Sequence, residues 1–212
     1  MQYPFFPSVA IVANGEIRSL SETQQLLSHY PEVVAVDGGL NYCDSMEIIP
    51  NLIIGDLDSV CPKILEKYSN NSILRYPLEK DESDLELAII ELIRRGVPSI
   101  ALFGVLGKRI DHLLYTLNLL ARYPSQLIIF SETETIFCLQ KENHIISKQG
   151  QTLSLIPLNS VLGVSTKGLK WEVKNARFNK NFMSLSNICI NDSFYVSLES
   201  GDLLCCLQSN PS

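Results

Sequence analysis

The sequence predicts an α/β domain followed by an all-β domain. From residue 9 to residue 130, short apolar runs alternate with segments whose apolar residues recur at helical spacing. After residue 130 the helical spacing disappears, and short apolar segments follow one another at roughly 8–12-residue intervals, which is typical of a sandwich or barrel. We therefore place an α/β domain over residues 1–132 and a β-sandwich or barrel over residues 133–212 of this 212-residue chain.

The predicted strands of the first domain are almost entirely apolar. Such runs indicate strands buried on both faces, and hence a Rossmann-like parallel sheet with helices on both faces. The predicted strands cover residues 9–13, 33–36, 52–54, 73–76, 100–103 and 127–130. The predicted helices cover residues 19–28, 62–68, 83–95 and 110–122. The helix over 83–95 has the clearest pattern, because Leu85, Ile89 and Leu92 share one face and Gly96 follows its end.

The second domain is predicted to consist of short strands separated by Gly, Asn and Pro. These strands cover residues 135–139, 144–147, 152–156, 161–166, 169–173, 187–190, 194–197 and 203–207. No Gly/Ser-rich linker precedes them, so we expect the two domains to pack firmly together.

Composition excludes several classes of protein. A formal charge of −6 and the lack of a basic stripe argue against a nucleic-acid partner. No apolar run reaches the roughly 18 residues of a membrane span, and residues 1–4 lack the basic start of a signal peptide. The six Cys show no metal-binding spacing. We expect a cytoplasmic protein with reduced thiols and neither a nucleic-acid nor a membrane partner.

Acidic residues and glycines follow the predicted strands. In an open parallel sheet, ligands bind beyond the carboxyl ends of the strands. In this sequence those ends carry residues 14–15, 37–39, 55–58, 80–84 and 104–111. Any single one of these is explained by a turn or a helix cap, but the whole set favours a site. Asp56 and Asp58 alternate, so their side chains point to the same side, as a pair of Mg²⁺ ligands would.

Three familiar motifs are missing. No GxGxxG follows the first strand, no GxSxG occurs, and residues 104–109 lack the spacing and the Ser/Thr of a phosphate loop. What remains is an acidic, glycine-bearing edge with Lys80, Lys108 and Arg109 beside it. Carboxylates for a metal ion and cations for phosphate are the usual combination for phosphoryl transfer.

Four motifs at this edge, taken in order, resemble those of the thiamin pyrophosphokinase family. They are Asp37-Gly38-Gly39-Leu40-Asn41, Gly55-Asp56-Leu57-Asp58-Ser59, Lys80-Asp81-Glu82-Ser83-Asp84 and Gly107-Lys108-Arg109-Ile110-Asp111-His112. The second half adds Ser154-Leu155-Ile156-Pro157, Thr166-Lys167-Gly168-Leu169-Lys170-Trp171 and Ser184-Leu185-Ser186-Asn187. The resemblance spans nearly the whole chain.

The resemblance implies transfer of a diphosphoryl group from ATP to the hydroxyl of thiamin, giving thiamin diphosphate and AMP. It also implies a homodimer with shared active sites and Mg²⁺ as cofactor. The metal ligands would be Asp56, Asp58 and Asp84, and the catalytic set would add Asp81, Arg109 and Asp111. The ATP-binding residues would be Asn14, Asp37, Gly38, Gly39, Asn41, Lys80 and Lys108.

Thiamin would be bound by Trp171, Ser186 and Asn187. Trp171 would offer its ring face from the partner subunit, although a place in the core of the second domain is the alternative. Three positions depart from the family pattern, namely Lys108 for Gly, Ser83 for Thr and Ile188 for Glu.

Other functions remain open at this point. A diphosphokinase for a hydroxymethylpterin would share the acidic edge, but it would not need the two motifs that end in Trp171 and Asn187. A non-catalytic sensor of nucleotide or thiamin diphosphate, and a metal-dependent phosphohydrolase, are the further alternatives.

Overall fold

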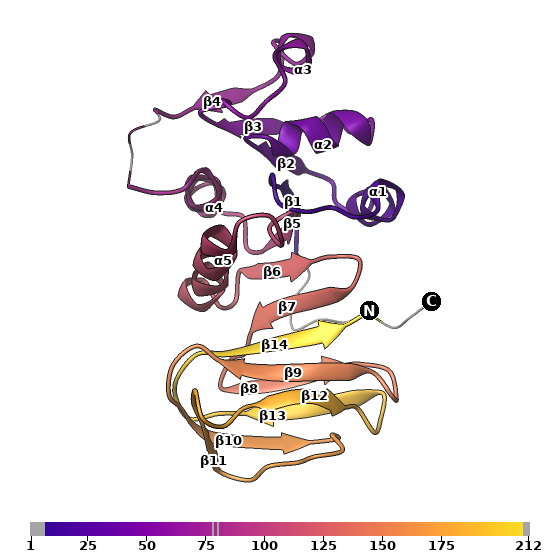
Figure 1. Ribbon diagram of the computed structural model, residues 1–212, viewed down its shortest axis with the longest axis vertical. Coiled ribbons are helices and arrows are strands. Elements are labelled where there is room, and N and C mark those ends of the chain that lie inside the picture. The colour runs from indigo at the N-terminus through magenta and orange to yellow at the C-terminus, as the bar shows by residue number, and fades with distance from the viewer. Residues whose placement is uncertain (1–6, 78, 80, 210–212) are drawn as a thin grey trace. The chain divides into compact units, whose positions relative to one another are not determined.

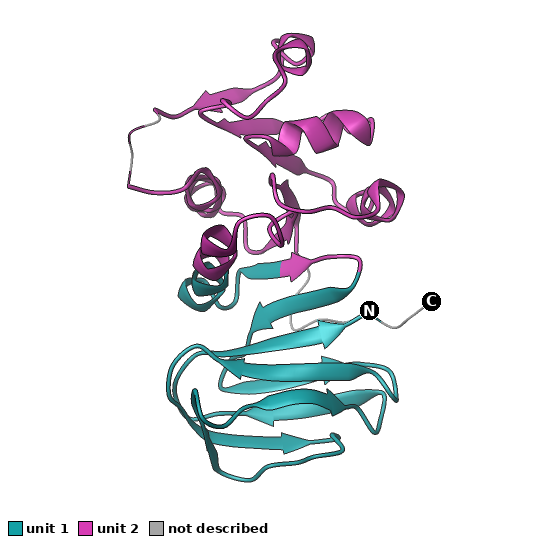
Figure 2. Ribbon diagram, in the orientation of Figure 1, with its two compact units in different colours: residues 1–6, 117–128, 133–212 teal, residues 7–116, 129–132 magenta. Residues whose placement is uncertain are grey.

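The computed structural model describes residues 7–77, 79 and 81–209 (Figure 1). These residues form two compact units (Figure 2). One unit contains residues 7–116 and 129–132, and the other contains residues 117–128 and the chain from 133 onward. An α/β part followed by an antiparallel β part is thereby confirmed. The boundary expected between residues 132 and 133 stays a prediction.

The first unit alternates strands and helices. Its strands are β1 (Val9–Val12), β2 (Val33–Val36), β3 (Leu52–Gly55), β4 (Ile73–Arg75) and β5 (Ile100–Phe103), with β6 (Leu127–Phe130) following the last helix. Its helices are α1 (Leu20–Leu27), α2 (Gly39–Ser45), α3 (Pro62–Lys67) and α4 (Asp84–Arg94). Helix α5 (Ile110–Arg122) and β6 are divided between the two units, since residues 117–128 belong to the other one. No helix within the described ranges has both the length and the apolar character that crossing a bilayer requires.

Strands β1 to β5 pair in parallel in the order β5-β1-β2-β3-β4. Every residue of β1, β2, β3 and β5 is buried, which the apolar runs of the sequence predict. Figure 1 shows α1 and α2 on one face of these strands and α4 on the other. The chain runs from β1 outward to β4 and then returns to β5 on the other side of β1. The carboxyl ends of β1 and β5 therefore flank the point where the strand order reverses.

Helix α2 is the one helix of this unit that the sequence reasoning missed. Its seven residues include Gly, Asn, Asp and Ser, which are weak helix formers. Tertiary packing compensates, because Leu40 and Cys43 are fully buried. Gly39 allows α2 to pack closely against the end of β1, since a Cβ at this position would lie 2.0 Å from the carbonyl oxygen of Val12. The helix is thus fixed against the end of β1.

The second unit is antiparallel. Its strands are β7 (Glu134–Cys138), β8 (Glu142–Ile146), β9 (Thr152–Pro157), β10 (Val161–Lys167), β11 (Ala176–Phe178), β12 (Ser184–Ile188), β13 (Ser193–Ser197) and β14 (Leu203–Gln208). The described strands belong to two sheets, a mixed one and an antiparallel one. In the antiparallel sheet the order is β11-β10-β13-β8, and β12, β9, β14 and β7 are neighbours in the other.

Burial alternates along several strands of this unit. In β8 the odd-numbered residues are buried and the even-numbered ones exposed, so this strand has one buried face. Phe137, Phe178 and Phe194 are fully buried in the core. The strand expected over 169–173 is wrong, because only a single bridge, Leu169 to Cys189, forms there. Strand β11 was not expected, and β12 begins three residues earlier than expected.

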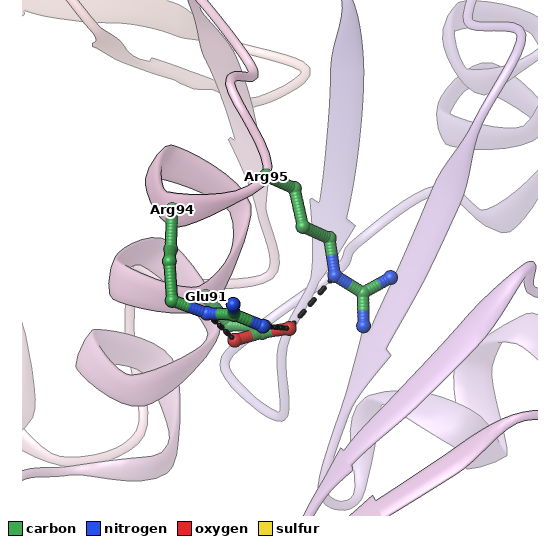
Figure 3. A network of polar contacts seen from close by, with 3 residues as sticks. All are labelled: Glu91, Arg94 and Arg95. Carbon is green, nitrogen blue, oxygen red and sulfur yellow. Dashed lines mark hydrogen bonds and ion pairs between the residues drawn. The ribbon is translucent and has the colours of Figure 1, made fainter.

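One carboxylate and two guanidinium groups form a hydrogen-bond network at the C-terminal end of helix α4. Glu91, which is 8% exposed, accepts two hydrogen bonds from Arg94 at 2.9 Å and one from Arg95 at 2.8 Å (Figure 3). These hydrogen bonds lower the pKa of Glu91 to about 2. Two cations near the last turn also suit the helix dipole. The network therefore fixes the C-terminal end of α4, whose N-terminal end faces the site described below.

We expect Glu91→Gln to lower the melting temperature by about 2–4 °C at pH 7. A carboxyl whose pKa is lowered by folding contributes stability above its ordinary value of 4.5, and that contribution is lost as the pH falls toward about 2. The two proteins should therefore converge near pH 2 in thermal melts followed by circular dichroism. Glu66→Gln, at an exposed position of α3, is the control. Equal melting temperatures at pH 7 would contradict this role of Glu91.

Candidate active site

A cavity of about 760 Å³ opens at the carboxyl ends of the parallel strands in the first unit. Its wall includes the segments after β1 and β5, which flank the point where the strand order reverses. Nine of the residues expected to form the site line it, namely Asn14, Asp37, Asp56, Asp58, Asp81, Asp84, Lys108, Arg109 and Asp111. Lys80 lies outside the described residues. The topology thus brings together acids and cations from five strand ends.

Three carboxylates form a tight cluster in this cavity. Asp37, Asp56 and Asp58 each offer one carboxylate oxygen within 4.8 Å of the others. The backbone turns sharply between the last two, because Leu57 has a φ of 66° and is buried. The Asp58 amide then donates to Asp56 Oδ1 at 3.1 Å. Both acids therefore remain on one side of the turn.

Repulsion within the cluster raises the pKa of Asp58. The negative charge of Asp56 is the largest cause and that of Asp37 the next. Asp84, the first residue of α4, makes the smallest of the contributions. The tight cluster therefore includes Asp37, which we expected to bind ATP, whereas Asp84 acts from the cavity wall. The predicted metal set of Asp56, Asp58 and Asp84 stays a prediction.

Asp37 is held in an unusual conformation. Its φ is 50°, its amide donates to the carbonyl of Ile54 at 2.8 Å, and its Oδ2 accepts a hydrogen bond from the Ser59 hydroxyl at 2.6 Å. Its other oxygen, Oδ1, is buried and has no hydrogen-bond partner among the described residues. Gly55 allows this arrangement, since a Cβ there would lie 3.2 Å from the Asp37 Cβ. The site thus contains one carboxylate oxygen that needs a partner.

Sequence reasoning missed two contributors to this cavity. Ser59 lines it and binds Asp37, and its only signal was its place at the end of the Gly55–Ser59 motif. Tyr115 also lines it and donates a hydrogen bond to Glu86, which is 4% exposed on α4. Tyr115 follows Asp111 by one helical turn, which places both on the same face of α5.

Three other residues expected to bind ATP, Gly38, Gly39 and Asn41, are not among those that line the cavity. A Cβ on Gly38 would lie 2.4 Å from the side chain of Asn14, and Gly39 permits the contact between α2 and β1. The Asn41 side chain donates to the carbonyl of Ser59 and accepts from the amide of Cys61, both at 3.0 Å. Asn41 therefore holds the loop that follows β3.

The cationic side of the cavity is already paired. Lys108 Nζ donates to the backbone carbonyl of Asn14 at 2.8 Å and to its Oδ1 at 3.3 Å, and it lies 5.2 Å from the centre of the Tyr42 ring. Arg109 forms a two-pronged ion pair with Asp111, at 3.1 and 2.5 Å. This pairing lowers the pKa of Asp111 to about 2. Asp111 is thus an ionised acceptor at any physiological pH.

The residues expected to bind thiamin lie in the second unit. Trp171 is 54% exposed, so its alternative place in the core is wrong. Asn187 is 1% exposed, because its side chain accepts from the Trp171 amide at 3.1 Å and donates to the Trp171 carbonyl at 2.8 Å. Ser186 is exposed on the same strand, with a φ of 52°. Asn187 therefore holds the backbone that presents the Trp171 ring, and a direct contact between Asn187 and thiamin stays a prediction.

We expect metal-free Asp58→Asn to melt at a higher temperature than the wild type at pH 7. Because neighbouring carboxylates raise the pKa of Asp58, the folded state binds this proton more tightly than the unfolded chain does. The stability that this bound proton gives the folded state is fully present below the ordinary pKa of 3.8. It is lost as the pH rises through the raised pKa of Asp58. The difference should shrink toward pH 3 in thermal melts. A variant that is less stable than the wild type at pH 7 would contradict the repulsion.

Comparisons with known proteins identify the family. Residues 23–130 match the sequence model of the thiamin pyrophosphokinase catalytic domain, and residues 137–203 match that of its vitamin B1 binding domain. Among curated relatives, thiamine pyrophosphokinase 1 of Oryza sativa subsp. japonica is 31% identical over 172 residues, which are 73% of this chain and 65% of the relative. Thiamine pyrophosphokinase 3 of the same organism is 31% identical over 71% of this chain and 62% of its own length. The chain thus spans less than two thirds of the length of these relatives.

Solved structures agree in fold. The thiamine pyrophosphokinase of Bacillus subtilis superposes with a TM-score of 0.82 at 23% identity, covering 96% of this chain and 99% of that one. The thiamin pyrophosphokinase of Candida albicans gives 0.83 at 20% identity, covering 95% and 88%. The chain belongs to the thiamin pyrophosphokinase family.

Proposed function

We propose that this protein transfers a diphosphoryl group from ATP to the hydroxyl of thiamin, releasing AMP and thiamin diphosphate. The observation that carries the proposal is that the clustered carboxylates, Lys108 and Arg109 line one cavity, in a chain of this family. We further propose that its parallel strands are used as in Rossmann-like folds, with the nucleotide beyond β1 and β5. A cytoplasmic location stays part of the proposal.

The carboxylates fit a divalent cation. Asp37, Asp56 and Asp58 converge, their repulsion raises a pKa, and Asp37 Oδ1 is buried without a partner among the described residues. Mg²⁺ prefers such oxygen ligands and retains sites for water and phosphate. We therefore propose that Asp56 and Asp58 hold it together with Asp37, and that Asp84 completes the set from α4. Bound there, the ion would neutralise charge on the triphosphate.

The chain's own cations would bind the phosphates. Lys108 and Arg109 follow β5 and line the same cavity as the carboxylates. A triphosphate would take the Arg109 guanidinium from Asp111, because both anions accept the same two-pronged hydrogen bonds. Asp111, once released, is a charged acceptor that can orient the attacking hydroxyl of thiamin. Asp81 and Lys80, in the segment before α4, are proposed to complete this edge.

Thiamin is proposed to contact the second unit through Trp171 and Ser186. The Trp171 ring has the Lys170 ammonium 4.7 Å from its centre, so this ring already attracts one cation. The cationic thiazolium of thiamin is a second suitable partner. We propose that a homodimer brings this segment to the cavity of its partner subunit. Asn187 would act by fixing the backbone of Trp171.

Incubation with ATP and Mg²⁺ tests the reaction. We expect AMP and thiamin diphosphate in equal amounts when thiamin is present, and almost no AMP without it, with nucleotides and thiamin esters separated by chromatography. A hydroxymethylpterin should not replace thiamin. Release of inorganic phosphate without thiamin would indicate a hydrolase, and binding without turnover would indicate a sensor. Either result would overturn the proposal.

Trp171→Ala should raise the KM for thiamin by about 3- to 30-fold, which corresponds to loss of a cation–π contact. The KM for ATP should stay nearly constant, because the Trp171 ring is proposed to contact the thiazolium of thiamin and not the nucleotide. Trp171→Phe, which retains an aromatic face, is the matched control and should show a smaller change. An unaltered KM for thiamin in Trp171→Ala would exclude Trp171 from the thiamin site.

A further inference from the structure

Four side chains in the cavity form one continuous chain of hydrogen bonds. Lys108 Nζ donates to Asn14 Oδ1 at 3.3 Å, and Asn14 Nδ2 donates to the Ser59 hydroxyl oxygen at 3.2 Å. Ser59 Oγ in turn donates to Asp37 Oδ2 at 2.6 Å. Each donor has its acceptor, and the direction of donation runs from the ammonium to the carboxylate. All four residues line the same cavity.

The link between Ser59 and Asp37 is the strongest of these contacts. A hydroxyl that donates to a carboxylate at this distance forms a charge-assisted bond. The hydroxyl has only one proton, so donation to Asp37 leaves its lone pairs for the Asn14 amide. Asn14 is itself held by Lys108, which fixes Ser59 from the other side. The rotation of the Ser59 hydroxyl is therefore determined by its neighbours.

This contact distinguishes the two oxygens of Asp37. Oδ2 is occupied by Ser59, whereas Oδ1 is buried and has no hydrogen-bond partner among the described residues. Leaving a buried carboxylate oxygen unpaired is costly, and the cost is removed when a cation binds it. The backbone of Asp37 is fixed as well, by its hydrogen bond to Ile54 and its contact with Gly55. With its backbone fixed, Asp37 can vary only in the rotamer of its side chain.

We propose that Ser59 is a positioning residue of the metal site: it binds Oδ2 of Asp37 and thereby reserves Oδ1 for the divalent cation. This inference rests on the metal site of the proposed function, and it adds Asp37 as a ligand and Ser59 as the group that orients it. Partners that orient a metal ligand typically contribute 10- to 100-fold to metal affinity. Ser59 acts through Asp37 and does not touch the ion.

Titration of the nucleotide-free protein with Mn²⁺, followed by the electron paramagnetic resonance of the free ion, tests the proposal without any turnover. Ser59→Ala should weaken Mn²⁺ binding by about 10-fold or more. Ser45→Ala is the matched control, because the Ser45 hydroxyl donates to the carbonyl of Asn41 at 2.8 Å on the neighbouring helix α2. Its Mn²⁺ affinity should equal that of the wild type.

A second comparison controls for the effects of side-chain shape at position 59 and of the folding of the variants. Ser59→Thr and Ser59→Val place side chains of the same size at an exposed position, and only the threonine retains the hydroxyl. The threonine variant should bind Mn²⁺ more tightly than the valine variant. In an Asp37→Ala background, Ser59→Ala should cause no further loss, because Ser59 has no carboxylate left to orient.

The outcomes separate this inference from the function on which it rests. Equal Mn²⁺ affinities for the wild type and Ser59→Ala, or for the threonine and valine variants, would overturn the role of Ser59. An equally large further loss in the Asp37→Ala background would show that Ser59 acts independently of Asp37, which also contradicts the inference. A wild-type protein that binds no Mn²⁺ would overturn the metal site itself.

Discussion

Electrostatic repulsion between carboxylates that the sheet forces together is the constraint on which this site depends. Parallel pairing of β2 with β3 brings Asp37 beside Asp56 and Asp58, and the buried turn at Leu57 keeps the last two on one side. The apolar strands supply the energy that holds this arrangement, since every residue of β2 and β3 is buried. This repulsion opposes folding at the cluster, and a bound cation would relieve it.

Most of the α/β unit could be predicted from the sequence because its strands are uninterrupted apolar runs. Helix α2 could not, since its residues are weak helix formers and its stability comes from burial of Leu40 and Cys43 against strands distant in sequence. The strand predicted over residues 169–173 does not form, although the local pattern is typical of a strand. Its apolar residues alternate as in a strand, but Leu169 alone forms a bridge and Trp171 is exposed. The sequence pattern of a short segment does not reveal which of its backbone N–H and C=O groups form hydrogen bonds with another strand.

The same distinction holds for the site. Positions beyond strand ends follow from topology, so Asp37, Asp56, Asp58 and Asp111 could be placed in one cavity from sequence alone. The hydrogen-bond and ion-pair partners of these side chains depend on their rotamers, which the sequence does not specify. Hence the contact of the Ser59 hydroxyl, the pairing of Arg109 with Asp111 and the burial of Asn187 follow from the folded structure and not from the sequence. Asn187 shows the difference most clearly, because its side chain holds the backbone of Trp171, a role that the sequence did not indicate.

Lys108 has a consequence for how an anion would leave the cavity. Its φ of 50° is a conformation that glycine adopts more easily, at a difference of about 1 kcal/mol, and its ammonium is already bound to Asn14. A phosphate that attracts this ammonium must replace an existing hydrogen bond, so the net gain is smaller than a free lysine would provide. Departure of the phosphate would return Lys108 to Asn14. If Lys108 binds phosphate as proposed, the loop after β5 would exchange one partner for another, and this exchange would lower the affinity for a highly charged product and favour its release.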